Sequence, residues 1–196
     1  MSAAVPDSQR KPRILLVNDD GIDSPYLPRM VRALAPLAEL QVAVPAEEQS
    51  WKGKAMTRFG PVIVRPHEGL GVPAFTVAGT PADCANLGVH HLFPERPDWV
   101  LSGINIGANV GVSYVLNSGT VCAAFEGALQ GLPAVAFSAR FSKSLFTQWM
   151  EHHHLEGEEG EALLDSTTTH MATLMGRVMA QGLPPGAMVL NVNFPG

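Results

Sequence analysis

The chain has 196 residues, of which 46% are hydrophobic and 16% are charged, and its formal net charge is −5 at pH 7. This length fits one domain of about 100–200 residues. The apolar share excludes an intrinsically disordered chain. The negative balance excludes a general nucleic-acid binder, because no basic surplus is available to neutralise phosphates.

Residues 1–12 are polar and lack the apolar centre of a signal peptide, so they are predicted to form a flexible N-terminal tail. No later stretch approaches the run of about 20 apolar residues that a membrane span needs. The two cysteines, Cys84 and Cys122, lie in apolar, helix-like segments without metal-type spacing. They are interpreted as reduced core residues rather than a disulfide, which predicts a cytoplasmic location.

Strand-like and helix-like patterns alternate along residues 13–196. Strands or extended pieces are predicted at 13–18, 40–45, 62–64, 75–77, 97–105, 133–138 and 187–195. Helices are predicted at 25–38, 80–93, 119–131 and 161–182. A long loop is expected at 46–57, and an insertion or mobile loop at 139–160. This alternation predicts a single α/β domain with layers of helices around a mostly parallel sheet.

Two adjacent acids, Asp19 and Asp20, follow the first predicted strand directly. In open parallel sheets, ligands bind beyond the carboxyl ends of the strands, where these acids lie. Neighbouring carboxylates repel each other unless a cation lies between them, and hard oxygen ligands suit Mg²⁺ or Mn²⁺. The alternative is that one acid caps the next helix while Asn18 and Gly21 make a turn. The pattern favours a divalent metal site.

The loop after the second strand, "VPAEEQSWKGKAMT", combines hydroxyl, glycine and lysine residues. Ser50 offers a hydroxyl oxygen, Gly53 permits a close turn, and Lys54 places positive charge where a negative group could enter. The alternative is an ordinary solvated loop, and this segment alone does not decide between the two.

The segment "SGINIGANVG", residues 102–111, contains the end of the strand predicted at 97–105 and the loop that follows it. Its glycines permit unusual backbone angles, while Asn105 and Asn109 are neutral oxygen ligands or hydrogen-bond donors. Neither the spacing nor a following helix matches the dinucleotide fingerprint. Its predicted position at the same sheet edge as Asp19 favours a functional loop over a plain turn.

Four polar or small residues, Asn117, Ser118, Gly119 and Thr120, stand at the start of the strongest predicted helix. Free amides and the positive end of the helix dipole form a natural phosphate site there. A plain cap by Ser118 is the alternative. With a metal predicted two loops away, we prefer the phosphate site.

These motifs, in this order, resemble the SurE family of survival-protein 5′/3′-nucleotidases and acid phosphatases. The matching segments are "ILLVNDDGI", "VAVPAEEQS…GKAMT", "GTPADCANLGV", "PDWVLSGINIGANVG", "NSGTVCAAFEGALQGLPAVAFS" and "LNVNFP". They cover residues 13 to about 195. The resemblance implies a Rossmann-like α/β domain, one divalent metal ion, and hydrolysis of nucleoside monophosphates.

The resemblance also implies roles for individual residues. The metal ligands would be Asp19, Asp20, Ser50 and Asn105, with the two acids and Asn105 also catalytic. The surroundings of the phosphate would include Asn109 and Ser118, Gly119 and Thr120. We further expect Asn18, Gly53 and Lys54 beside the substrate.

Two departures from the family pattern accompany this match. Family members continue past the L-N-V-N strand into a C-terminal extension that builds the oligomer and covers the site. This chain ends at Gly196, so 13–196 is expected to be a catalytic domain without that extension, in a family of homodimers or homotetramers. Many relatives have glycine after the serine of the second loop, whereas this chain has Trp51, which would narrow the pocket or stack on a base.

The predicted reaction uses one Mg²⁺ or Mn²⁺ ion that binds a phosphate oxygen and acidifies a water, with no stable nucleic acid or membrane as partner. A covalent alternative would phosphorylate Asp19, as in haloacid-dehalogenase-type phosphatases, although their pattern is D-x-D. A phospho-receiver module also carries paired acids after its first strand, but Ser102 and Lys143 do not match its acceptor and lysine. An inactive metal-binding module is the last alternative.

Overall fold

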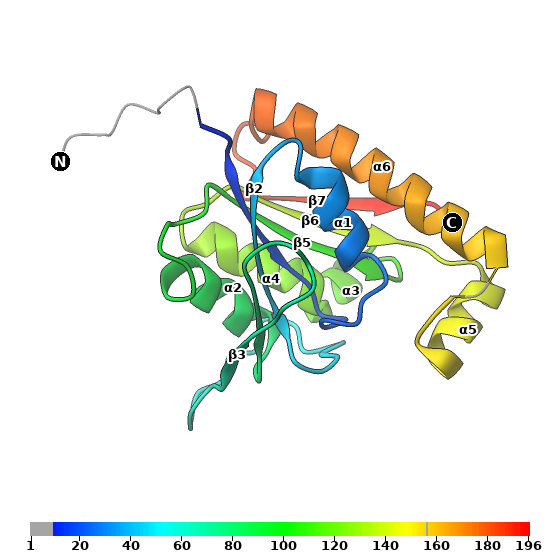
Figure 1. The fold of residues 1–196 in the computed structure, drawn as a ribbon, viewed down its shortest axis with the longest axis horizontal. Helices are drawn as coiled ribbons and strands as arrows, with labels where there is room; N and C mark the ends of the chain where they lie inside the picture. The colour runs from blue at the N-terminus through cyan, green and yellow to red at the C-terminus, as the bar shows by residue number, and fades with distance from the viewer. Residues whose placement is uncertain (1–9, 156) are drawn as a thin grey trace.

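A central sheet of seven strands runs through the structure, a computed structural model that describes residues 10–155 and 157–196 (Figure 1). The strands are β1 (Arg13–Val17), β2 (Glu39–Pro45), β3 (Val64–Pro66), β4 (Ala74–Val77), β5 (Trp99–Ile106), β6 (Ala134–Ala139) and β7 (Val189–Phe194). Their order is β3-β4-β2-β1-β5-β6-β7. Neighbouring strands are parallel except for β3 and β4. The predicted α/β fold with a mostly parallel sheet is confirmed.

Helices cover both faces of this sheet (Figure 1). They are α1 (Leu27–Leu34), α2 (Pro81–His90), α3 (Val112–Asn117), α4 (Gly119–Leu129), α5 (Lys143–His152) and α6 (Gly157–Gln181). Successive strand residues point to opposite faces. In β1, Ile14 and Leu16 therefore join the core under α1 and α6, whereas Leu15 and Val17 join the core under α2 and α4. Burial on both faces explains why residues 14–17 of β1 are all apolar.

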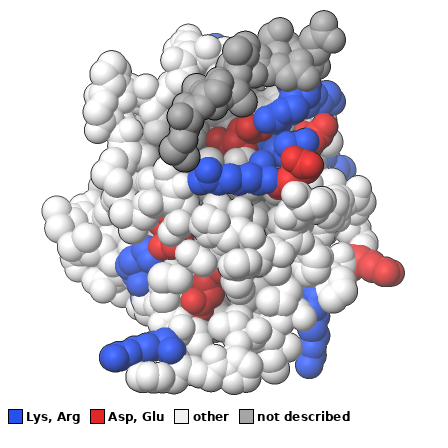
Figure 2. All heavy atoms as spheres, turned by 90° about the vertical axis from the view of Figure 1, so that its left-hand side faces the viewer, with Lys and Arg blue, Asp and Glu red and all other residues white. Residues whose placement is uncertain are grey.

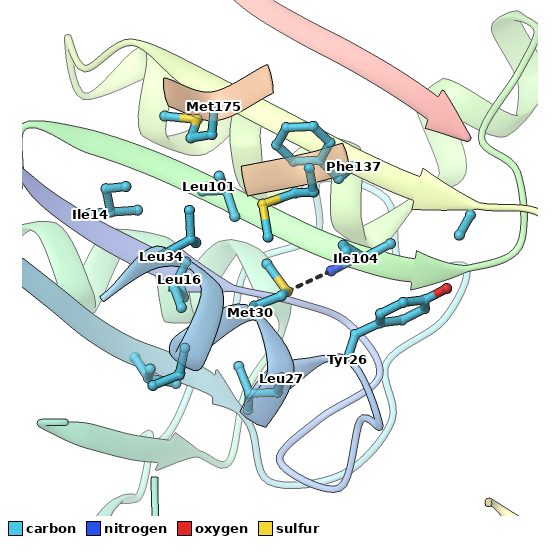
Figure 3. Packing of buried hydrophobic residues seen from close by; sticks show 14 of the residues in the cluster. Ile14, Leu16, Tyr26, Leu27, Met30, Leu34, Leu101, Ile104, Phe137 and Met175 are labelled. Carbon is cyan, nitrogen blue, oxygen red and sulfur yellow. Dashed lines mark hydrogen bonds between the residues drawn. The ribbon is translucent and has the colours of Figure 1, made fainter. Parts of the chain in front are cut away.

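The core on the α1 side ties the first helix to the strand that carries Asn105. Met30 of α1, Ile104 of β5, Phe137 of β6 and Met175 of α6 are all buried there (Figure 3). The backbone amide of Ile104 donates to the sulfur of Met30 at 3.1 Å. This packing holds α1, which follows the Asp-Asp loop, against the end of β5.

Side chains cap the starts of helices α2 and α4. The Thr80 side chain accepts a hydrogen bond from the amide of Asp83, and the Asp83 side chain accepts one from the amide of Thr80, at 3.1 and 2.9 Å. The Ser118 hydroxyl accepts from the amide of Val121 at 3.0 Å. These side chains satisfy amides that a helix start would otherwise leave without partners.

The prediction for residues 139–160 was wrong, because this segment contains helix α5 and the start of α6. Ser142 caps α5 by accepting from the amide of Leu145 at 3.3 Å. Leu145 and Trp149 are both buried in the core on the α1 side. Their spacing of four residues is typical of one helix face and was the signal missed among the surrounding polar residues. The short helix α3 was likewise not predicted.

Part of the predicted N-terminal tail is described. Residues 1–9 lie outside the described residues, but the Arg10 guanidinium makes two hydrogen bonds of 2.7 Å to the Asp98 carboxylate. Arg13 pairs with Glu39 at 3.1 Å.

On the face drawn in Figure 2, positive and negative side chains lie next to one another and form no continuous basic field. Among the described helices, none combines the length and the apolar composition needed to cross a membrane.

Candidate active site

The candidate site lies beside β1, at the point where the order of the strands in the sheet reverses. From β1 the chain continues through α1 to β2 on one side, whereas β5 lies on the other side of β1. Loops that leave two such strands diverge, which opens a crevice beyond their carboxyl ends. A cavity of about 240 Å³ lies there. It is lined by Asp19, Ser50, Trp51, Asn105, Ile106, Gly107, Ala108, Asn109, Tyr114, Asn117, Ser118 and Phe146.

The Asp19 carboxylate is buried against the start of α4. The hydroxyl of Thr120 donates to its Oδ1 atom. A Cβ atom added at Gly119 would lie 2.8 Å from Cβ of Asp19 and 3.0 Å from its Oδ2, so a larger residue at 119 would displace the acid. The first turn of α4, where we predicted a phosphate, therefore orients Asp19 directly.

Both acids of the pair have raised pKa values. Burial raises the pKa of Asp19 to about 6, although hydrogen bonds from Thr120 lower it and the charge of Glu48 raises it. Burial, followed by the charges of Asp19 and Glu48, raises the pKa of Asp20 well above its usual range. Oδ2 of Asp20 is buried and has no hydrogen-bond partner among the described residues. A positive charge placed beside this pair would favour the ionised form of both acids.

The turn that carries the two acids is closed by Asn18. Its amide nitrogen donates to the carbonyl of Gly21 at 2.8 Å, and its Oδ1 accepts from the amide of Gly21 at 3.1 Å. Gly21 has a φ of +85°, which glycine adopts without strain. The structure thus places Asn18 behind the acids and outside the cavity lining, where it positions Asp19 and Asp20.

Asn105 reaches the cavity through an irregularity near the end of β5. The pairing of β5 with β6 shifts register between Ser102 and Asn105. Gly103 lies there with a φ of +112°, and a Cβ atom at this position would lie 2.2 Å from the carbonyl oxygen of Phe137. The Asn105 amide nitrogen donates to the carbonyl of Gly107 at 2.7 Å. The side-chain oxygen of Asn105 is the atom that could bind a hard cation, because the amide nitrogen acts only as a hydrogen-bond donor.

Backbone hydrogen bonds hold the 46–57 loop beside the two acids. The amide of Gln49 donates to the carbonyl of Asp19 at 2.8 Å, and the amide of Gly53 donates to the carbonyl of Asn117 at 2.9 Å. Between these anchors, the Ser50 hydroxyl donates to Glu48 at 2.6 Å and lines the cavity. The Ser50 oxygen keeps lone pairs for a ligand.

Lys54 does not reach the cavity lining. Its ammonium group pairs with the buried carboxylate of Glu126 on α4. Glu126 also accepts from the side-chain amides of Asn86 and Gln130 at 2.8 and 2.7 Å. Burial opposes ionisation of Glu126, but the hydrogen bonds from these three partners outweigh it and lower its pKa. Sequence reasoning missed Glu126, although a lone acid within an apolar helix was a signal.

The last strand holds the Asn109 turn in place. The backbone amide of Asn109 donates to the side-chain oxygen of Asn193 at 2.8 Å. The backbone carbonyl of Asn109 accepts a hydrogen bond from the side-chain amide of Asn191 at 2.9 Å. The Asn109 side chain donates to the hydroxyl of Ser138 at 2.9 Å. Sequence reasoning assigned no role to Asn191 and Asn193, although their spacing of two places them on one face of a strand.

Comparison with known proteins identifies the family. The model of the family described as "Survival protein SurE" matches residues 14–196. The chain belongs to the SurE family. The family resemblance of the motifs is thereby confirmed.

Individual SurE relatives match most of this chain. It is 40% identical to "5'-nucleotidase SurE" of Deinococcus radiodurans over 97% of its own length and 68% of the relative's. It is 42% identical to "5'-nucleotidase SurE 1" of Thermus thermophilus over 93% of its length and 66% of the relative's. The crystal structure of the SurE protein from Aquifex aeolicus superimposes with a TM-score of 0.76 at 33% identity, covering 94% and 66% of the two chains. The chain therefore spans about two thirds of the length of these relatives.

The SurE fold of this chain brings only some of the predicted site residues to one cavity. The cavity lining includes Asp19, Ser50, Asn105, Asn109 and Ser118. Directly behind it, Gly119 and Thr120 contact Asp19, and Gly53 contacts the end of α3. Asn18 and Lys54 turn to other partners, and Asp20 is not part of the cavity lining, so the roles predicted for these three residues stay predictions.

The donor set in this SurE-family site is dominated by oxygen. In the described part of the chain, no group of three or more His, Cys, Asp or Glu side chains could by itself hold a metal ion. Any ion beside Asp19 and Asp20 would therefore need neutral oxygens as well, and Ser50 and Asn105 offer them. Carboxylate, hydroxyl and amide oxygens are ligands that suit Mg²⁺ or Mn²⁺.

Proposed function

We propose that this chain is a metal-dependent phosphomonoesterase that hydrolyses nucleoside 5′- or 3′-monophosphates to nucleoside and phosphate. The names of the Deinococcus and Thermus relatives, both 5'-nucleotidases, support this substrate class. The observation that carries the proposal is the acid pair, in which the buried Oδ2 of Asp20 has no hydrogen-bond partner among the described residues and Asp19 faces the cavity. Such a pair fits one divalent cation, Mg²⁺ or Mn²⁺.

In this proposal, Asp19, Asp20, Ser50 and Asn105 hold the ion. A divalent ion bound there would neutralise phosphate charge as a Lewis acid and lower the pKa of water. Among the described residues, the cavity lining includes no lysine, arginine or histidine. Attraction of a phosphate into the cavity therefore depends on the ion and on neutral donors.

Neutral donors at the cavity wall would orient the phosphate. The Asn109 amide nitrogen uses one N–H for Ser138, which leaves a second N–H for a phosphate oxygen. Asn191 and Asn193 hold the backbone of Asn109, so this donor is already in position before substrate binds. Donors fixed in this way stabilise developing negative charge without reorganisation during the reaction.

A covalent route through Asp19 remains the enzymatic alternative, and trapping of an acyl phosphate on Asp19 would decide for it. The family membership does not favour the phospho-receiver alternative. A cytoplasmic location and assembly as a homodimer or homotetramer stay predictions.

The experiment that tests the proposal measures phosphate release from a panel of nucleoside monophosphates with Mg²⁺ or Mn²⁺, and then with a chelator. We expect hydrolysis that the chelator abolishes and metal restores. Asp19→Asn and Asp20→Asn should abolish hydrolysis while the domain stays folded. Asp23→Asn is the matched control, because Asp23 is an exposed acid that lies three residues after Asp20 in the same loop. Chelator-resistant hydrolysis would exclude the proposed mechanism.

A further inference from the structure

The rim of the cavity carries aromatic side chains from separate parts of the chain. Trp51 comes from the 46–57 loop, Tyr114 from α3 and Phe146 from α5, and all three line the cavity. Their side chains are exposed to solvent, by 66% for Trp51, 52% for Tyr114 and 44% for Phe146. Exposed apolar residues scattered over a surface need no explanation, but a group converging on one cavity is typical of a ligand site.

Trp51 and Tyr114 contact each other at this rim and form what we call the aromatic pair. Their ring centroids are 5.6 Å apart, with the ring planes tilted by 53°. Trp51 has a φ of +60°, a left-handed conformation that bulky residues rarely adopt. The surrounding backbone imposes it, since Gln49 is bonded to Asp19 and Gly53 to Asn117 on either side. The indole is thus held at the cavity mouth although it is exposed.

We propose that the aromatic pair is the nucleobase-binding element of this chain, with the base stacked on Trp51 and Tyr114 while the phosphate lies among Asp19, Asn105 and Ser118. This inference rests on the proposed function and deepens it. A nucleoside monophosphate carries an anionic group at one end and a flat aromatic group at the other. The cavity lining combines the same two chemistries, polar side chains and exposed aromatic rings.

The chemistry of the pair also determines what it selects. Stacking on an aromatic ring is tolerant of sequence because every base has a π-face. Among the described residues that line the cavity, none is a lysine, arginine or glutamate that could read a base edge through a charge. We therefore expect broad acceptance of bases, with purines bound more tightly than pyrimidines because their ring surface is larger. Sugar phosphates that lack a base gain nothing from the pair.

The kinetic test compares AMP with ribose 5-phosphate in the presence of Mg²⁺. Trp51→Gly is the informative variant, because glycine adopts a φ of +60° without strain and so deletes the indole while keeping the loop. We expect this variant to raise KM for AMP about five- to 150-fold, the range for loss of one base–aromatic stack, and to leave kcat/KM for ribose 5-phosphate unchanged. Trp51→Phe should restore most of the affinity for AMP.

The matched control is Phe59→Ala. Phe59 is 80% exposed but does not line the cavity, so its removal should change neither substrate. An equal loss for AMP and ribose 5-phosphate in Trp51→Gly would overturn the proposal, because the indole would then only support the loop. Unchanged kinetics for both substrates would overturn it as well.

A binding measurement separates this inference from the proposed function, because it needs no turnover. Trp99 and Trp149 are buried, at 9% and 7% exposure, so an added solute reaches mainly Trp51. We expect AMP with Mg²⁺ to quench the tryptophan fluorescence of the wild type but not of Trp51→Gly, and ribose 5-phosphate to quench neither. This result without hydrolysis would support the aromatic pair and refute the nucleotidase. No quenching by AMP at saturating concentration would refute the pair.

Discussion

The most informative single substitution is Asp19→Asn, because it should stabilise the metal-free domain while it removes the proposed activity. The buried Asp19 carboxyl has a pKa of about 6, against an ordinary value of 3.8. A shift of this size corresponds to about 3 kcal/mol of folding free energy, at about 1.4 kcal/mol per pKa unit. Asparagine keeps the shape and the oxygen that accepts from Thr120 but carries no charge.

The sign of this effect fixes its pH dependence. Because the folded pKa is raised, the folded state binds more protons than the unfolded state between about pH 4 and pH 6. The penalty for burying the charge is absent below the ordinary pKa, grows as pH rises through that window, and is complete above about pH 6. The gain from Asp19→Asn should therefore be up to about 3 kcal/mol at pH 7.5 and close to zero at pH 4.

The assay is thermal unfolding in the presence of a chelator at several pH values. For a chain of this length, a gain of about 3 kcal/mol corresponds to roughly 6–12 °C in Tm. Mg²⁺ or Mn²⁺ should raise the Tm of the wild type at pH 7.5 but not that of Asp19→Asn, and Asp23→Asn should behave as the wild type. If Asp19→Asn instead lowered the Tm of the metal-free domain at every pH, the acid would be well partnered and the case for a missing cation would fail.

Three further experiments test how the site is supported. Lys54→Met should lower the free energy of unfolding, measured in urea, by about 1–3 kcal/mol, because it leaves the buried Glu126 without its cation. Adding Glu126→Gln to this variant should recover part of that loss. If the losses of the two single variants were instead additive, the two residues would not be coupled. Gly119→Ala should weaken Mg²⁺ binding measured by calorimetry, because its Cβ would lie 2.8 Å from the nearby acid, and an unchanged affinity would show that the acid can move freely. Asn193→Ala should lower kcat/KM about ten- to a hundredfold by loosening the backbone of Asn109, with metal affinity unchanged, and a loss of metal affinity would contradict that assignment.

The sequence by itself determined the fold class and the place of the site. Continuous apolar runs such as residues 14–17 are typical of strands buried on both faces, so their alternation with helices specified a covered parallel sheet. An acid pair directly after the first strand located the cavity edge, because ligands collect beyond the carboxyl ends of parallel strands. A cap such as Thr80 bonds to its own helix within three residues, so it depends on local sequence alone.

Only the tertiary structure decided which polar side chains face the cavity. Lys54 was expected near the phosphate, but it pairs with Glu126, a residue on a different element. Asn109 is held by Asn191 and Asn193 from the last strand, and Trp51 meets a ring of α3. The periodicity of hydrophobic residues shows which face of a helix or strand is buried. These contacts instead join segments that are distant in the chain, and their geometry depends on how the packed layers bring the loops together.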